Sequence, residues 1–178
     1  WYAAGAQYPV EWRRDDGEVM GILITPGSPT IVTGTAWKYD AKVSDVSWYV
    51  YPSGYTNSTR MMITLLGLNE DGSPNPDDVL HVEENVPNQI GWNTCHLSQS
   101  VSAPNGFFAG ISGYDNTVIL AYDDGEGEPY VWEARSQWGN GLGAYTPLEN
   151  GTSPPLRANI FVRAAGLTFG PIESKGMP

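Results

Sequence analysis

Cysteine and histidine are almost absent from this chain. Cys95 is the single cysteine among 178 residues, so an intramolecular disulfide is excluded. That argues against the disulfide-stapled secreted proteins of eukaryotes and favours a bacterial secreted protein. With only two histidines, His81 and His96, a metal–histidine cluster or a Ser–His–Asp set is not expected. Cys95 is expected to be a small buried hydrophobe, with His96 on the opposite face of the same strand.

Positive charge is also scarce. Nine Lys and Arg stand against 20 Asp and Glu, giving a formal net charge of −11. Such a surface repels phosphate backbones and anionic lipids, which excludes nucleic acid as a partner. The longest apolar run, MMITLLGL, is too short to cross a bilayer, so no membrane insertion is expected. Because the chain begins at Trp1, we expect a processed product, secreted to the cell surface or the extracellular space.

No window shows a long helical period of apolar residues, and 21 Gly and 14 Pro interrupt the chain. The apolar runs are short and rich in Val, Ile, Tyr and Trp, which is typical of strands. We predict an all-β fold: an antiparallel β-sandwich of about ten strands with little or no helix, forming a single domain over residues 1–178. Residues 1–11 are expected to form an N-terminal arm or edge strand, and residues 167–178 a C-terminal tail.

Strands are predicted on both sides of the Asp-Asp-Gly turn in EWRRDDGEVMGI and at 30–39, 43–52, 60–69, 80–86, 91–98, 105–112, 117–122, 129–135 and 158–166. The segment NEDGSPNPDD, the most punctuated of the chain, is expected to be a turn region. In the strand at 43–52, alternation places Val46, Trp48 and Val50 on one face and Ser47, Tyr49 and Tyr51 on the other. One face is expected to be packed and the other partly exposed.

The order of these segments resembles a known type of module. The quoted motifs are EWRRDDG, AWKY, SWYVY, ITLLGLNEDGSPNPDDVL, GWNTCHLS, FFAGISG and NIFVRA. Together they resemble the jelly-roll modules of large secreted bacterial proteins, to which the cleaved-adhesin modules of gingipains are related. The resemblance covers Trp12 to Gly166 and leaves out the long 136–156 loop and the last residues. It implies a non-catalytic module that binds a glycan or a cell-surface or extracellular protein, in some cases with structural calcium.

Acidic loops are the candidate calcium sites, since Ca²⁺ takes oxygen ligands from carboxylates and carbonyls. The candidates are Asp15, Asp16, Asp71, Asp123 and Asp124, each beside a glycine that turns the chain. No loop completes an EF-hand pattern, and the alternative is a plain Asp-Gly turn. The resemblance implies a metal that ties an early strand to a late one, which favours the loops near Asp15 and Asp123.

Aromatic side chains are the candidate glycan platforms, because sugar rings stack on flat exposed Trp and Tyr faces. Trp138 and Tyr145 lie on the long loop after Ser136, where no alternation directs them into the core. Tyr130 and Trp132 share one face of their strand. The alternative for each Trp is core packing.

Two other functions remain open. The acidic residues Glu126, Glu128 and Glu133 lie near aromatics, as in a glycosidase, which needs two carboxyl groups flanking the scissile bond. The strand motifs of small jelly-roll xylanases are not recognisable, however, and we do not expect an enzyme. The second alternative is a self-assembling extracellular subunit, a homo-oligomer in which the aromatic N-terminal arm adds a strand to a neighbour's sheet.

Overall fold

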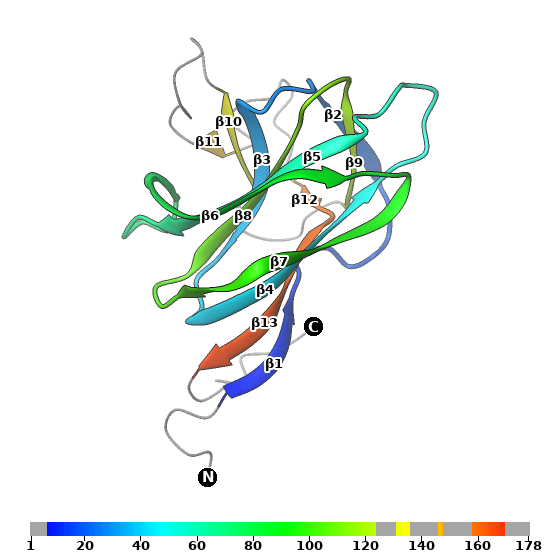
Figure 1. Cartoon of the computed structure of the whole chain (residues 1–178). Helices are drawn as coiled ribbons and strands as arrows, with labels where there is room; N and C mark the ends of the chain where they lie inside the picture. The colour runs from blue at the N-terminus through cyan, green and yellow to red at the C-terminus, as the bar shows by residue number, and fades with distance from the viewer. Residues whose placement is uncertain (1–6, 124–130, 136–145, 148–157, 170–178) are drawn as a thin grey trace.

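A computed structural model describes residues 7–123, 131–135, 146–147 and 158–169 (Figure 1). These residues form two antiparallel sheets. The seven-stranded sheet contains β1 (Gln7–Trp12), β2 (Gly21–Thr25), β4 (Ala41–Val50), β7 (Gly91–Ala103), β9 (Val118–Asp123), β12 (Asn159–Ile160) and β13 (Val162–Phe169). The six-stranded sheet contains β3 (Ile31–Trp37), β5 (Arg60–Leu68), β6 (Pro74–Pro87), β8 (Phe107–Gly113), β10 (Val131–Arg135) and β11 (Thr146–Pro147). Within the described residues there is no helix, and so none that could span a membrane.

The chain changes sheet at almost every connection. It passes from β3 to β4, back to β5, and again between sheets after β6, β7, β8 and β9. All named strand pairs are antiparallel. The predicted all-β antiparallel sandwich of jelly-roll type is therefore confirmed. The described residues carry the strand segments β1 to β13, more than the roughly ten expected, in part because the short β11 and the split between β12 and β13 were not predicted.

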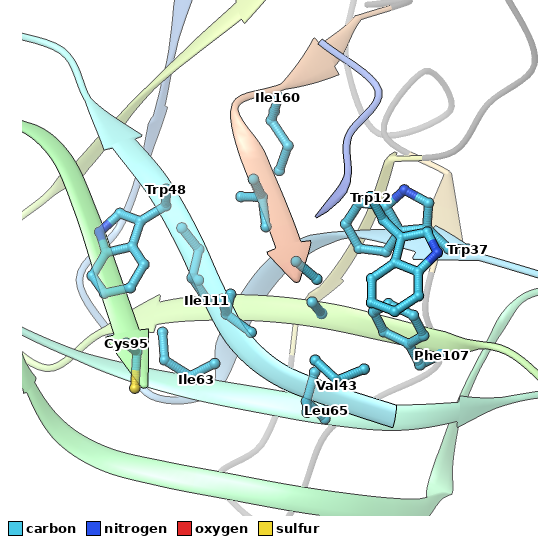
Figure 2. Packing of buried hydrophobic residues seen from close by; sticks show 14 of the residues in the cluster. Trp12, Trp37, Val43, Trp48, Ile63, Leu65, Cys95, Phe107, Ile111 and Ile160 are labelled. Carbon is cyan, nitrogen blue, oxygen red and sulfur yellow. The ribbon is translucent and has the colours of Figure 1, made fainter. Parts of the chain in front are cut away.

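The hydrophobic core lies between the two sheets. As the alternation predicts, Val46, Trp48 and Val50 point inward from β4 and are buried. Cys95 is buried in the same cluster, which confirms its predicted role as a small hydrophobe. Figure 2 shows Trp48 near Cys95 at one end of this core, and Trp12 and Trp37 beside Phe107 at the other. The residues of β4 between these inward positions are thereby directed to the outer face of the seven-stranded sheet.

Two predicted boundaries differ from the structure, at the start of β6 and at the end of β13. The segment around Pro74–Asp78, expected as a turn region, opens β6, where Pro74 pairs with Leu68 of β5. Proline is tolerated there because β6 is an edge strand. Strands flank the DDG segment, as predicted, but they do not pair with each other: β1 pairs with β13, whereas β2 pairs with β9.

At the C-terminal end, β13 extends to Phe169, into the segment predicted as a tail. Its last residues are held on both sides, by β1 and by β4. The main chain of β1 likewise hydrogen-bonds within its own chain over Gln7–Trp12. Figure 1 shows β1 beside β13 at one edge of the sheet.

Candidate functional site

A row of aromatic side chains crosses three strands on the outer face of the seven-stranded sheet. Tyr49 of β4 is the register partner of Trp92 of β7, and their ring centroids are 5.5 Å apart. Phe161, at the junction of β12 and β13, lies 6.1 Å from Trp92 with the rings inclined by only 15°. Trp92 remains 41% exposed. An exposed indole supported by two aromatic neighbours is a firmly held flat surface.

A buried ion pair supports the same indole. The Arg163 guanidinium lies 4.2 Å from the centroid of the Trp92 ring, a cation–π arrangement. Its Nε and Nη2 donate to the two carboxylate oxygens of Asp15 at 3.0 and 2.5 Å. Hydrogen bonds to Asp15 raise the pKa of Arg163. The Asp15 side chain is fully buried, so Arg163 is anchored by a group that water does not reach.

The chain around Asp15 is itself fixed in place. The main-chain N–H of Asp16 donates to the carboxylate of Asp123 at 2.9 Å, and Asn159 N–H donates to the other oxygen at 3.2 Å. Gly17, with φ of 91°, reverses the chain directly afterwards. Asp123 thus joins the loop after β1 to the end of β9 and the start of β12.

A groove of about 540 Å³ continues the face beyond the aromatic row. Its polar lining comes from Glu11, Lys42, Ser44, Asp45 and Ser100, and its apolar lining includes Pro9 and Leu167. Glu11 connects the two parts of the face, since its carboxylate lies 3.8 Å from Nη1 of Arg163. Groove and aromatic row therefore form one continuous surface, which we call the outer-face site.

Polar side chains connect the groove to the strands that carry Trp92 and Arg163. Asp45 contacts the ring nitrogen Nδ1 of His96 and accepts a 2.5 Å hydrogen bond from the Ser44 hydroxyl. Ser47 and Thr94, register partners on β4 and β7, lie 2.9 Å apart through their hydroxyls. The outer-face site therefore combines an aromatic platform with carboxylates, hydroxyls and an imidazole.

Three of the predicted calcium ligands, Asp15, Asp16 and Asp123, accept hydrogen bonds from protein groups. The carboxylate oxygens of Asp15 accept hydrogen bonds from the Arg163 guanidinium. Those of Asp123 accept hydrogen bonds from main-chain N–H groups. Asp16 accepts from the N–H of Glu18 at 2.7 Å. Over the described ranges, no group of three His, Cys, Asp or Glu is placed to hold a metal ion. Early and late strands do meet at Asp15 and Asp123, as the resemblance implies, and calcium binding there stays a prediction.

Of the remaining predicted site residues, the structure describes Asp71 and the main chain of Trp132, and both lie away from the outer-face site. Asp71 closes its own turn, accepting from the N–H and hydroxyl of Ser73 at 2.9 and 2.6 Å, and these bonds lower its pKa. The main chain of Trp132 pairs with Gly34 and Pro147 in the six-stranded sheet. The predictions that name Asp124, Tyr130, Trp138 and Tyr145 fall outside the described residues.

Sequence reasoning missed Trp92, although the signal was present. In GWNTCHLS, a strand with Cys95 facing inward must direct Trp92, Thr94 and His96 outward. The same alternation directs Tyr49 outward, because its neighbour Trp48 points inward. What the sequence did not contain was the register that brings Tyr49 and Trp92 side by side.

A Ser–His–Glu cluster links the edges of the two sheets. Nε2 of His81 lies 2.8 Å from Glu83 and 3.5 Å from the hydroxyl of Ser98. A catalytic relay requires the acid and the serine on different ring nitrogens, whereas both contact the same one here. The thiol of Cys95 is equally unsuited to nucleophilic attack, because burial raises its pKa to about 11.

The Glu83 cluster makes a pH-dependent contribution to stability. Hydrogen bonds from Ser98 and His81 lower the pKa of Glu83 from 4.5 to about 2. Because the folded-state pKa is depressed, this stabilisation is present above pH 4.5 and is lost as the pH falls through 2. We expect Glu83→Gln to lower the free energy of unfolding at neutral pH, and the gap from wild type to close in acid. Urea unfolding of both proteins between about pH 2 and pH 7 measures the difference in the free energy of unfolding. Glu84→Gln, at an exposed neighbouring position, is the control. A difference that does not change with pH would refute the pH-dependent role of Glu83.

Comparison with known proteins bears on the fold. No protein-family model and no curated protein matches this chain. A structure of the clostridial cysteine protease Cwp84 after propeptide cleavage aligns with a TM-score of 0.61 and 9% identity, over 91% of this chain and 40% of that one. A structure of the cysteine protease and lectin-like domains of Cwp84, a surface layer associated protein of Clostridium difficile, aligns with a TM-score of 0.55 and 9% identity, over 84% and 34%. The chain spans less than half of either, and at this identity the likeness shows a shared fold alone.

Proposed function

We propose that this chain is a non-catalytic binding module of the cell surface or extracellular space, and that it binds a glycan on the outer-face site. The observation that carries the proposal is Trp92. An indole 41% exposed would ordinarily be free to move, but here Phe161, Tyr49 and Arg163 hold it in place. Such rigidity reduces the entropy lost when a ligand stacks on the ring. Arg163 also lies 3.8 Å from Glu11, which lines the groove.

The polar groups of the site suit the rest of a sugar. A sugar ring offers apolar C–H faces to an aromatic platform, and hydroxyls at its rim to polar side chains. Glu11 and Asp45 supply carboxylate acceptors, while Ser47 and Thr94 supply hydroxyls between the groove and Trp92. Few placed polar groups around an apolar surface are typical of small-molecule sites.

The two structures with a similar fold are compatible with an extracellular binding module, but at 9% identity they do not establish one. One of the two Cwp84 structures is described as containing lectin-like domains and as part of a surface layer associated protein. The acidic charge of this chain, −11, suits a soluble module that does not adhere to anionic polymers. Calcium is left out of the proposed site, because the described carboxylates near Asp15 hold protein donors.

Trp92→Ala is expected to weaken glycan binding markedly while leaving the fold intact. Loss of the stacking surface should weaken affinity about tenfold, since aromatic contacts are worth about 0.5–1.5 kcal/mol beyond their buried area and the buried area is lost as well. Stability should change little, because an outer-face ring leaves no core cavity. Glycan-array binding followed by calorimetry on the strongest ligand measures the first effect, and thermal melting the second.

Three matched variants locate the platform. Trp92→Phe should retain part of the affinity, because a flat ring remains. Tyr55→Ala removes an aromatic that is 60% exposed but outside the groove lining, and should bind as wild type. Trp138→Ala tests the loop platform predicted from sequence. If Trp138→Ala loses binding and Trp92→Ala does not, the outer-face site is wrong; if no glycan binds and oligomers form, self-assembly becomes the better proposal.

A further inference from the structure

We infer that the outer-face site selects glycans without negative charge, and that Glu11 and Asp45 are the specificity-determining residues. The inference rests on the proposed function and goes beyond it by naming the ligand class. It begins from the charges of the groove. Among its lining residues, two carboxylates, Glu11 and Asp45, face one ammonium, Lys42.

Two other basic groups near the groove, Arg163 and His96, are already engaged. Arg163 gives Nε and Nη2 to Asp15, and its Nη1 lies 3.8 Å from Glu11. His96 contacts Asp45 through Nδ1. A ligand carboxylate or phosphate would therefore have to compete with a fully buried protein carboxylate for the guanidinium. Of Arg163, His96 and Lys42, only Lys42 is without an acidic partner among the described residues.

The acids, in contrast, have acceptor capacity to spare. An ionised carboxylate offers about four lone-pair sites and no donor. The Glu11 side chain is 56% exposed and its nearest cation is 3.8 Å away, beyond hydrogen-bond distance. Hydroxyl groups of an uncharged sugar can donate to these oxygens, whereas an anionic substituent can only repel them. One like-charge pair at about 5 Å weakens binding roughly fourfold in a water-like dielectric, and more in a less polar groove.

The test compares glycans that differ in charge alone. A β-mannan oligomer and a β-mannuronan oligomer share backbone and linkage, but the second carries carboxylates in place of primary alcohols; cello-oligosaccharides and their C6-carboxylated forms make a second pair. For each pair, the uncharged member is expected to bind at least about fourfold more tightly at low ionic strength. High ionic strength should reduce this difference in affinity, because salt screens the repulsion between the glycan carboxylates and the acidic groove residues.

Variants assign the selectivity to residues. Glu11→Gln and Asp45→Asn are each expected to raise affinity for the carboxylated member about two- to fivefold without raising affinity for the uncharged one. Glu18→Gln, an exposed acid on the segment between β1 and β2 and outside the groove lining, should change neither. A carboxylated member that binds more tightly, weakens with salt and is lost in Lys42→Gln would overturn the inference in favour of Lys42 as an anion receptor. Equal binding within each pair would overturn the inference alone, and binding to none of the glycans would overturn the proposed function with it.

Discussion

Arg163→Met is expected to lower the free energy of unfolding by about 3–5 kcal/mol, because it leaves a buried carboxylate without its partner. Asp15 has no exposed side-chain surface and both its oxygens are on the Arg163 guanidinium. For a domain of this size the melting temperature should fall by roughly 6–20 °C. Arg60→Met is the matched control, since Arg60 is exposed and makes one 3.3 Å bond to Asn85; its loss should be within about 0.5 kcal/mol.

Two further experiments test whether the stability lost in Arg163→Met comes from the Asp15–Arg163 ion pair. The double variant Asp15→Asn with Arg163→Met removes both charges and should recover part of the stability. Melting in excess Ca²⁺ and in excess EDTA separates this account from a metal site. If Asp15 acts through Arg163, the double variant should lose the same stability, relative to wild type, in Ca²⁺ and in EDTA. A loss confined to the Ca²⁺ arm would instead show that Asp15 ligates calcium, and an unchanged melting temperature would refute the buried pair.

Trp48→Ala should destabilise the protein by about 3–5 kcal/mol, as large aromatic truncations in cores do. Trp48 is fully buried between the sheets, and its Nε1 donates to the side chain of Asn88 at 2.8 Å. Asn88 in turn donates to the main-chain carbonyl of Ser58 at 2.6 Å, so the loss reaches the loop before β5. Chemical unfolding measures the effect.

The control for this change lies one strand away. Trp92 is on β7, next to β4, but on the outer face, so Trp92→Ala removes the same side chain without opening a core cavity. Its loss of stability should be a small fraction of that for Trp48→Ala. Comparable losses from both substitutions would mean that the outer aromatic row is structural rather than a binding surface.

The fold was predictable from the sequence because its signals are local. Short Val-, Ile- and Tyr-rich runs between Gly and Pro indicate strands, and two-residue alternation sorted Val46 and Trp48 from Ser47 and Tyr49. The burial of Cys95 was expected because a free cysteine usually behaves as a small buried hydrophobe. Where the prediction was wrong, as for the start of β6 at Pro74, an edge position tolerated residues that a central strand would exclude.

The candidate site was less predictable, because it depends on contacts between distant segments. Asp15 and Arg163 are 148 positions apart, and neither residue signals the other. From the sequence alone, the acidic Asp15–Asp16–Gly17 segment resembles a metal-binding loop. In the structure, the Arg163 guanidinium binds the Asp15 carboxylate. Likewise the aromatic row needs the pairing of β4 with β7 and with β13, and strand pairing is set by topology rather than by local composition.

The indole N–H signals of the seven tryptophans offer the most direct test of where ligand binds. In a two-dimensional ¹H–¹⁵N spectrum, with the Trp92 signal assigned by Trp92→Phe, an uncharged oligosaccharide from the array is titrated into the wild-type protein. The outer-face site predicts that the Trp92 signal shifts and saturates with the calorimetric affinity, while the signal of buried Trp48 stays in place. A saturating shift of the Trp138 signal with Trp92 unmoved would contradict the account and place the glycan on the loop instead.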